Sequence, residues 1–119
     1  MKVHEGDGQA LSDLGELYRE RGQAKLALKC FRKLVKMYPH VPLGFAQLAS
    51  VYRDLDETDK AITAYERSIE LDPNFSAALH NVALCYMAQQ RYREAENYFL
   101  RALKSKDRFH QVRFKFWKT

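Results

Sequence analysis

The chain has 119 residues and a formal net charge of +5, with 46% hydrophobic and 29% charged residues. This length supports one domain, and the composition is that of a folded globular protein rather than a disordered chain. No run of 18 apolar residues occurs, so the sequence predicts no membrane span. The first ten residues, MKVHEGDGQA, lack the apolar segment of a signal peptide. Two cysteines without CxxC spacing and four scattered histidines predict no disulfide framework and no metal site, and they favour a reducing, cytoplasmic compartment.

The chain repeats itself every 34 residues when it is aligned as three rows, 8–41, 42–75 and 76–109. Within each row the apolar residues follow helical spacing on two successive faces, which predicts two helices per row. Several aligned positions are constant in kind, and they hold Tyr18, Tyr52 and Tyr86; Gly15, Ala49 and Ala83; Ala27, Ala61 and Ala95; and Phe31, Tyr65 and Phe99.

The expected helices, in chain order, span about 9–21, 24–37, 43–55, 58–71, 77–89 and 92–105. Gly22 can end the first helix in a left-handed conformation, and Thr58 can act as the N-cap of the fourth. Pro39 and Pro73 stand where the second and fourth helices must stop, whereas the third row has Asp107 there. The small residues aligned with Gly15 are expected to face the aligned alanines, so that the two helices of a hairpin approach closely.

This succession of small and aromatic positions resembles the tetratricopeptide repeat (TPR) family, whose unit is a 34-residue helix–turn–helix. The resemblance implies an all-α, right-handed α-solenoid of three TPR hairpins with a C-terminal cap or tail. It also implies a protein-interaction scaffold that holds a peptide segment or partner helix in a concave groove lined mainly by the first helices. The expected divisions are an N-terminal extension (1–7), TPR 1 (8–41), TPR 2 (42–75), TPR 3 (76–109) and a basic, aromatic cap or tail (110–119).

Ten residues on the first helices are candidates for the peptide-binding groove. Three of them, Asp13, Gln47 and Asn81, share one aligned position; in similar superhelical proteins amides there hold the backbone of an extended ligand. The alternative is that these are solvated positions on amphipathic helices. The surface grades from charged to apolar toward the C-terminus, which suits a ligand with a basic or polar end and an aliphatic or aromatic end. The ten candidates are Asp13, Glu16, Arg19, Gln47, Ser50, Arg53, His80, Asn81, Leu84 and Met87.

Two other activities are disfavoured by the residues present. Chaperone-binding TPR proteins grip a C-terminal carboxylate with lysine, arginine and asparagine, but the matching positions here lack basic residues, and Glu16 would repel a carboxylate. No Gly-rich phosphate loop, GxSxG or HExxH motif occurs; Cys85 aligns with apolar residues, and Cys30 has no evident base. We therefore expect no enzyme, no cofactor and no metal. The positions matching the carboxylate grip hold Ser12, Glu16, Gln47, Ala77 and Asn81.

The C-terminal segment FHQVRFKFWKT does not continue the repeat, and its periodicity does not decide between helix and strand. Residues 104–119 contain six basic residues and one acidic residue, so the net charge of the chain belongs to this end. One interpretation is a cap over the third repeat. A second is self-association through the C-terminal end, which gives the alternative function of an assembly module. A third, contact with nucleic acid or an acidic surface, is the least favoured, because the same residues suit a cap.

Overall fold

The computed structural model describes the backbone of residues 5–118 and the side chains of residues 7–105. These residues form six α-helices and no strand, which confirms the all-α prediction. Four helices agree with the predicted bounds to within one residue, whereas the first begins earlier and the last ends later than predicted. The helices are α1 (Glu5–Glu20), α2 (Ala24–Met37), α3 (Pro42–Asp54), α4 (Thr58–Leu71), α5 (Ser76–Ala88) and α6 (Tyr92–Lys118).

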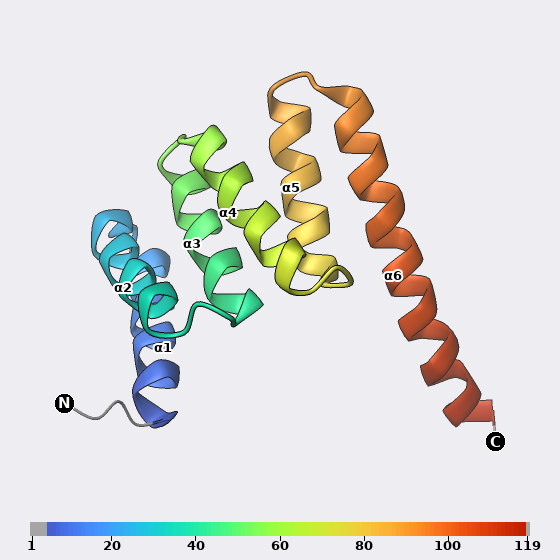
Figure 1. The fold of residues 1–119 in the computed structure, drawn as a ribbon, viewed down its shortest axis with the longest axis horizontal. Helices are drawn as coiled ribbons and strands as arrows, with labels where there is room; N and C mark the ends of the chain where they lie inside the picture. Colours follow the sequence, from blue (N-terminus) through green and yellow to red (C-terminus); the bar gives the residue numbers. More distant parts are fainter. Residues whose placement is uncertain (1–4, 119) are drawn as a thin grey trace.

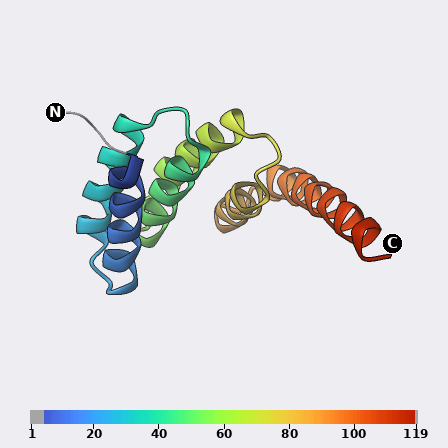
Figure 2. The same ribbon diagram turned by 90° about the horizontal axis from the view of Figure 1, so that it is seen from below.

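Consecutive helices pack as hairpins, α1 with α2, α3 with α4 and α5 with α6. The hairpins stand side by side in chain order, with α2 against α3 and α4 against α5 (Figure 1). Seen from below, the row of hairpins is bent rather than straight (Figure 2). This arrangement is the helical-hairpin solenoid that the 34-residue period predicts.

The seam inside each hairpin is lined by small residues, as predicted, because Gly15, Ala49 and Ala83 are all buried. The first hairpin differs from the prediction in detail. The side chain nearest to Gly15 is the ring of Phe31 and not the methyl group of Ala27, since Phe31 lies one turn further along α2. A Cβ atom at position 15 would lie 2.6 Å from two carbons of that ring. The close packing of α1 on α2 at this point therefore depends on the missing side chain of Gly15.

The three turns inside the hairpins share one backbone conformation. Gly22, Asp56 and Gln90 occupy the same aligned position, and all three have positive φ, at 75°, 60° and 60°. In each turn the next residue donates its backbone N–H to the carbonyl of the aligned tyrosine, for example Gln23 to Tyr18 at 2.8 Å. This is the hydrogen bond of a Schellman C-cap, and it confirms the left-handed cap predicted at Gly22.

The prediction that Thr58 is an N-cap is wrong. Thr58 is the first residue of α4, and the N-cap is Glu57, whose side chain makes no capping hydrogen bond. The backbone N–H of Ala61 donates to the carbonyl of Glu57 at 3.0 Å, so the helical hydrogen bonds begin one residue before the threonine.

The C-terminal segment is helical in its backbone, since α6 continues without interruption to Lys118. No proline or glycine occurs between Lys106 and Lys118, and Asp107 replaces the proline that stops the corresponding helices earlier in the chain. The interpretation of residues 110–119 as a cap or tail depends on side chains that lie outside the described residues.

Candidate binding face of the first helices

The ten predicted groove residues all lie on the first helices α1, α3 and α5, and each is at least partly exposed. Three polar contacts join these helices side chain to side chain. The Gln47 amide nitrogen lies 2.8 Å from the Ser12 hydroxyl oxygen, and the Arg53 guanidinium donates to the Asn81 side-chain oxygen at 3.5 Å. Since the contacts pass from α1 to α3 and from α3 to α5, these helices present their polar side chains to one another. We call the surface formed by the ten residues the first-helix face.

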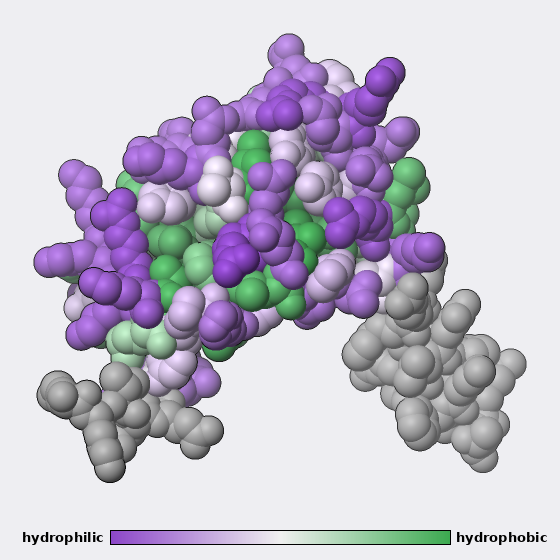
Figure 3. All heavy atoms as spheres, viewed as in Figure 1, coloured by the Kyte–Doolittle hydropathy of each residue, from purple (hydrophilic) through white to green (hydrophobic). Residues whose placement is uncertain are grey.

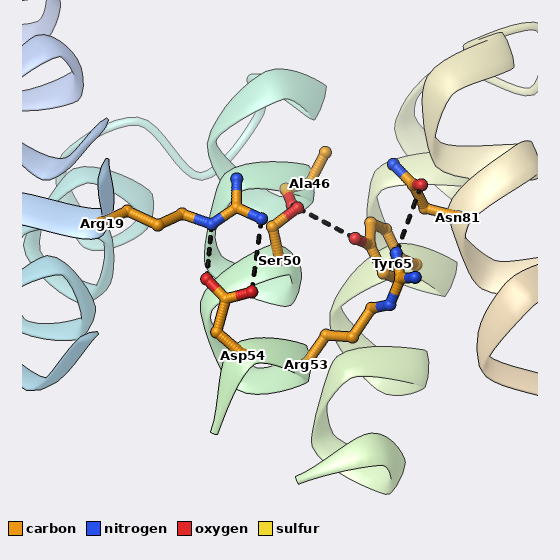
Figure 4. A network of polar contacts seen from close by, with 7 residues as sticks. All are labelled: Arg19, Ala46, Ser50, Arg53, Asp54, Tyr65 and Asn81. Carbon is orange, nitrogen blue, oxygen red and sulfur yellow. Dashed lines mark hydrogen bonds and ion pairs between the residues drawn. The ribbon is translucent and has the colours of Figure 1, made fainter. Parts of the chain in front are cut away.

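The shortest of the contacts between hairpins is an ion pair between α1 and α3. Arg19 donates two hydrogen bonds to the carboxylate of Asp54, at 2.6 and 3.4 Å (Figure 4). The hydrogen bond to Asp54 raises the pKa of Arg19, and the charges of Asp54 and Glu16 add to this effect. Because the pair is partly exposed, we expect it to orient the two helices more than it stabilises them.

Two further residues of the face are already hydrogen-bonded within the protein. Ser50 bonds the Ala46 carbonyl at 3.1 Å, and its hydroxyl lies 2.9 Å from that of Tyr65, whose ring is fully buried (Figure 4). Asp13 accepts a hydrogen bond from the Gln9 amide at 3.0 Å. Ser50 therefore supports the aromatic core of the second hairpin, a role that sequence spacing did not indicate.

The third-row residues of the face have surroundings different from those of the first two rows. The His80 ring meets Phe99 on α6 edge-on, with ring centroids 5.6 Å apart. Met87 is exposed and Leu84 is half-buried. Unlike Arg19 and Arg53, the aligned Met87 has no charge with which to reach across to another helix.

A shallow pocket of about 200 Å³ lies beside this face, between the start of α1 and the start of α3. It joins the predicted residue Gln47 to exposed apolar residues outside the ten candidates, Val41 in the preceding loop and Leu43 at the start of α3. Val41 was missed because it lies in the loop before α3, outside the helical pattern on which the prediction was based. The pocket is lined in part by Gln9, Ser12, Tyr38, Val41, Leu43 and Gln47.

A larger hollow of about 660 Å³ lies elsewhere, beside α3 and α4. Its lining includes Leu48 and Tyr52, which belong to the packing between hairpins. Lys60 lies 5.8 Å from the centre of the Tyr52 ring, and Arg67 lies 5.8 Å from that of Phe45. On the face seen in Figure 1, hydrophobic atoms show in patches among hydrophilic side chains (Figure 3). Since charged side chains stand over its apolar lining, we assign this hollow to packing.

Neither cysteine has the surroundings of a nucleophile. Both are free and buried, and burial raises the pKa of the Cys30 and Cys85 thiols, which keeps them protonated near neutral pH. Within the described part of the chain no group of three or more histidine, cysteine or acidic side chains is placed to hold a metal ion. No helix within the described ranges is both long enough and apolar enough to cross a bilayer.

Two family models with the description tetratricopeptide repeat match the chain, one over residues 46–109 and one over residues 9–40. The chain therefore belongs to the tetratricopeptide repeat family.

The chain is 30% identical over 94 residues to the peroxisomal targeting signal receptor of Candida glabrata, a match that covers 79% of this chain and 16% of the receptor. It thus spans about a sixth of the length of that relative. Among solved structures, MamA matches with a TM-score of 0.83 at 26% identity, over 87% of this chain and 61% of that one. The TPR2AB domain of yeast Sti1, solved in complex with pHSP90, matches with a TM-score of 0.86 at 22% identity, over 92% of this chain and 42% of that one. This last likeness shows the fold alone.

Proposed function

We propose that the chain is a protein-interaction scaffold whose first-helix face binds an extended segment of another protein. The observation that carries the proposal is the juxtaposition of the Gln47 amide with the pocket between α1 and α3. An amide offers a donor and an acceptor to a ligand backbone, while Val41 and Leu43 offer apolar surface to a ligand side chain.

The charges of the face define the ligand further. On α1 the face carries Asp13 and Glu16, and the one cation there, Arg19, is already paired with Asp54. A ligand with a basic or polar residue over α1 and an aliphatic or aromatic residue over Leu84 and Met87 is complementary to this gradient. A peptide ending in acidic residues is not, because nothing replaces the lysine and arginine of the carboxylate grip. Nucleic acid is not the proposed ligand, because the α1 part of the face presents Asp13 and Glu16 and its Arg19 is already paired.

The proposed units remain three repeats at 8–41, 42–75 and 76–109, with an extension at 1–7 and a cap or tail at 110–119. The matches at 9–40 and 46–109 support the repeat character of this range. We propose a binding role without catalysis, in keeping with a family of scaffolds, and a reducing cytoplasmic setting, supported by two free, buried thiols.

The test is to select binders from a random peptide library displayed on phage and to measure their affinity by fluorescence anisotropy with synthetic labelled peptides. The chain is compared with the double variant Gln47→Ala/Asn81→Ala. Because each amide is expected to contribute one or two hydrogen bonds of about 1 kcal/mol, the double variant should bind about tenfold or more weakly.

The matched control is Gln23→Ala/Asn97→Ala, which removes one glutamine and one asparagine from exposed positions away from the first-helix face. It should bind like the unaltered chain, and thermal melts should show both variants folded. The proposal is wrong if the selected peptides bind the double variant as tightly as the unaltered chain. Preferential selection of peptides with acidic C-termini would contradict the assigned ligand chemistry.

A further inference from the structure

The N-terminal end of the row of hairpins exposes apolar residues that are buried elsewhere in the repeat. Leu17 on α1 is 47% exposed, whereas the aligned Val51 on α3 is fully buried and Cys85 on α5 is 1% exposed. Leu14, one turn earlier on α1, is exposed in the same way. In the second and third hairpins these positions are covered by the preceding hairpin. The first hairpin carries the same apolar surface without such a cover among the described residues.

The C-terminal end of the row exposes residues whose aligned counterparts are covered by the next hairpin. Leu103 on α6 is 57% exposed, but the aligned Ile69 on α4 is only 6% exposed. Phe99 is partly buried, whereas the aligned Phe31 and Tyr65 are fully buried. These positions are covered by the following hairpin in the first two hairpins. The described part of the chain supplies no such cover for the third.

The two internal junctions show which of these residues meet. Phe31 packs in one cluster with Leu48 and Val51, and Tyr65 packs in another with Val82 and Cys85. Suppose that a second molecule followed the third hairpin in the same register. Phe99 of the first molecule would then contact Leu14 and Leu17 on α1 of the second, because these two leucines align with the internal partners.

A second apolar pair follows from the same register. The Val35 side chain reaches the backbone at Gly44, where a Cβ atom would lie 3.3 Å from it. The residues aligned with Val35 and Gly44 at the open ends are Leu103 and Ala10. In the same register the exposed Leu103 of one molecule would lie against the small, exposed Ala10 of the next.

One polar contact carries over with matching chemistry, whereas the Arg19–Asp54 ion pair aligns with Met87 and Glu20 at the open ends and does not. The internal pair Ser12 and Gln47 aligns with His80 at the C-terminal end and Asp13 at the N-terminal end, a donor and an anion. The tyrosine hydroxyls at the internal junctions contact Arg32 and Glu66, and the residue aligned with these two at the open end is the exposed Leu100. Leu100 would then lie against the ring of Tyr18.

We propose that a second copy of this chain packs its α1 onto the α5–α6 end of the first, and repeats between molecules the junction that joins hairpins within one molecule. The contact is head-to-tail, so it uses two different surfaces and leaves one free at each outer end. Assembly therefore does not stop at a dimer. This self-assembly is a property separate from the proposed binding of a ligand on the first-helix face, because it uses the two ends of the row of hairpins.

The test is sedimentation velocity over a wide concentration range with the full chain and two single variants, Leu17→Glu and Leu103→Glu. The average mass of the unaltered chain should rise with concentration past that of a dimer. Each variant alone should stay monomeric where the unaltered chain assembles, because one half of every junction carries a buried charge. Circular dichroism should show both variants folded, since the replaced side chains are exposed.

The decisive sample is an equimolar mixture of the two variants. One variant keeps an intact C-terminal end and the other an intact N-terminal end, so the mixture should form a heterodimer and nothing larger. The matched control is Leu26→Glu. Leu26 is 41% exposed, and the aligned Lys60 and Glu94 show that the second and third hairpins tolerate a charge at this position, so this variant should assemble like the unaltered chain.

Three results would overturn the proposal. An unaltered chain that is monomeric at every concentration would leave the end surfaces to a different protein. Assembly that survives in one variant but not in the other would indicate a symmetric contact between like ends. A mixture that stays monomeric although the unaltered chain assembles would show that these two surfaces do not meet.

Discussion

At Gly15 the spacing of α1 and α2 depends on the absence of one methyl group. The aligned positions hold Ala49 and Ala83, which are fully buried, so a methyl group is tolerated in the other two hairpins. In the first hairpin the Phe31 ring occupies the space that the methyl group would need. Aligned positions with the same small character therefore have different tolerances, because only at Gly15 is the ring of the facing helix shown to fill the space of a methyl group.

We predict that Gly15→Ala destabilises the protein, contrary to the usual effect of replacing a helical glycine. Alanine gains about 1 kcal/mol in helix propensity, but displacing a fully buried ring costs about 1–3 kcal/mol. The net loss in the free energy of unfolding should be about 1 kcal/mol, measured by urea denaturation.

A double-mutant cycle separates the two effects. In a Phe31→Leu background the clash is relieved, so Gly15→Ala should become neutral or stabilising. A loss of equal size in both backgrounds would show that the ring is not the cause.

The first-helix face has two roles at the scale of single residues. Arg19, Gln47 and Arg53 each contact the neighbouring hairpin, so these side chains join repeats as well as line the candidate groove. Ser50 is hydrogen-bonded to the core through Tyr65. Asp13 and Met87 are exposed and are the more available to a ligand.

At the scale of the helical hairpin, the turn is a Schellman cap built three times with three different residues. Only one of the three left-handed positions is a glycine, although the backbone conformation is the same in each. No atom lies within 4 Å of a Cβ added at Gly22, so the preference for glycine there is one of backbone conformation alone. Aspartate visits this region more readily than glutamine does.

We predict that Gln90→Gly stabilises the protein by up to about 1 kcal/mol, and that Asp56→Gly stabilises it less. The reverse change, Gly22→Ala, should destabilise by about 1 kcal/mol. Thermal unfolding monitored by circular dichroism would rank the three. A Gln90→Gly variant less stable than the unaltered chain would mean that contacts of the glutamine side chain outweigh the backbone strain.

At the scale of the whole molecule, buried groups that must stay neutral are spread over the hairpins. Burial raises the pKa of Tyr65, Tyr86 and Tyr98, and a hydrogen bond to Glu66 raises that of Tyr86 further. The pKa values of Cys30 and Cys85 are raised by burial as well. In each case the folded protein holds its proton more tightly than the unfolded chain does.

The stability should therefore fall in alkali. It is fully present below the unfolded-state pKa values, about 8.5 for cysteine and about 10 for tyrosine, and is lost as the pH rises toward the higher folded-state values. Urea denaturation at a series of pH values should show a decline that begins near pH 8.5 and steepens near pH 10. In a Cys30→Ala/Cys85→Ala variant only the later decline should remain. A flat profile in strong alkali would contradict the raised pKa values.

The sequence by itself determined the local architecture. The 34-residue period, the helical spacing of apolar residues and the placement of Gly22, Pro39 and Pro73 predicted the six helices and the left-handed cap. Helix positions and caps depend on residues within one or two helical turns along the chain, and these can be read directly from the sequence. The extra length of α6 follows from the same rules, because Asp107 takes the place of the stopping proline.

The tertiary structure alone decided how side chains of different helices are shared. The ion pair between Arg19 and Asp54, the ring of Phe31 over Gly15 and the pocket beside Gln47 depend on the rotation and spacing of packed helices. Packing also makes aligned residues differ in exposure. Leu17 and Leu103 are exposed at the ends of the row, whereas the aligned Val51 and Ile69 are buried. A periodic sequence presents these positions as equivalent, and only the finite row of hairpins makes them different.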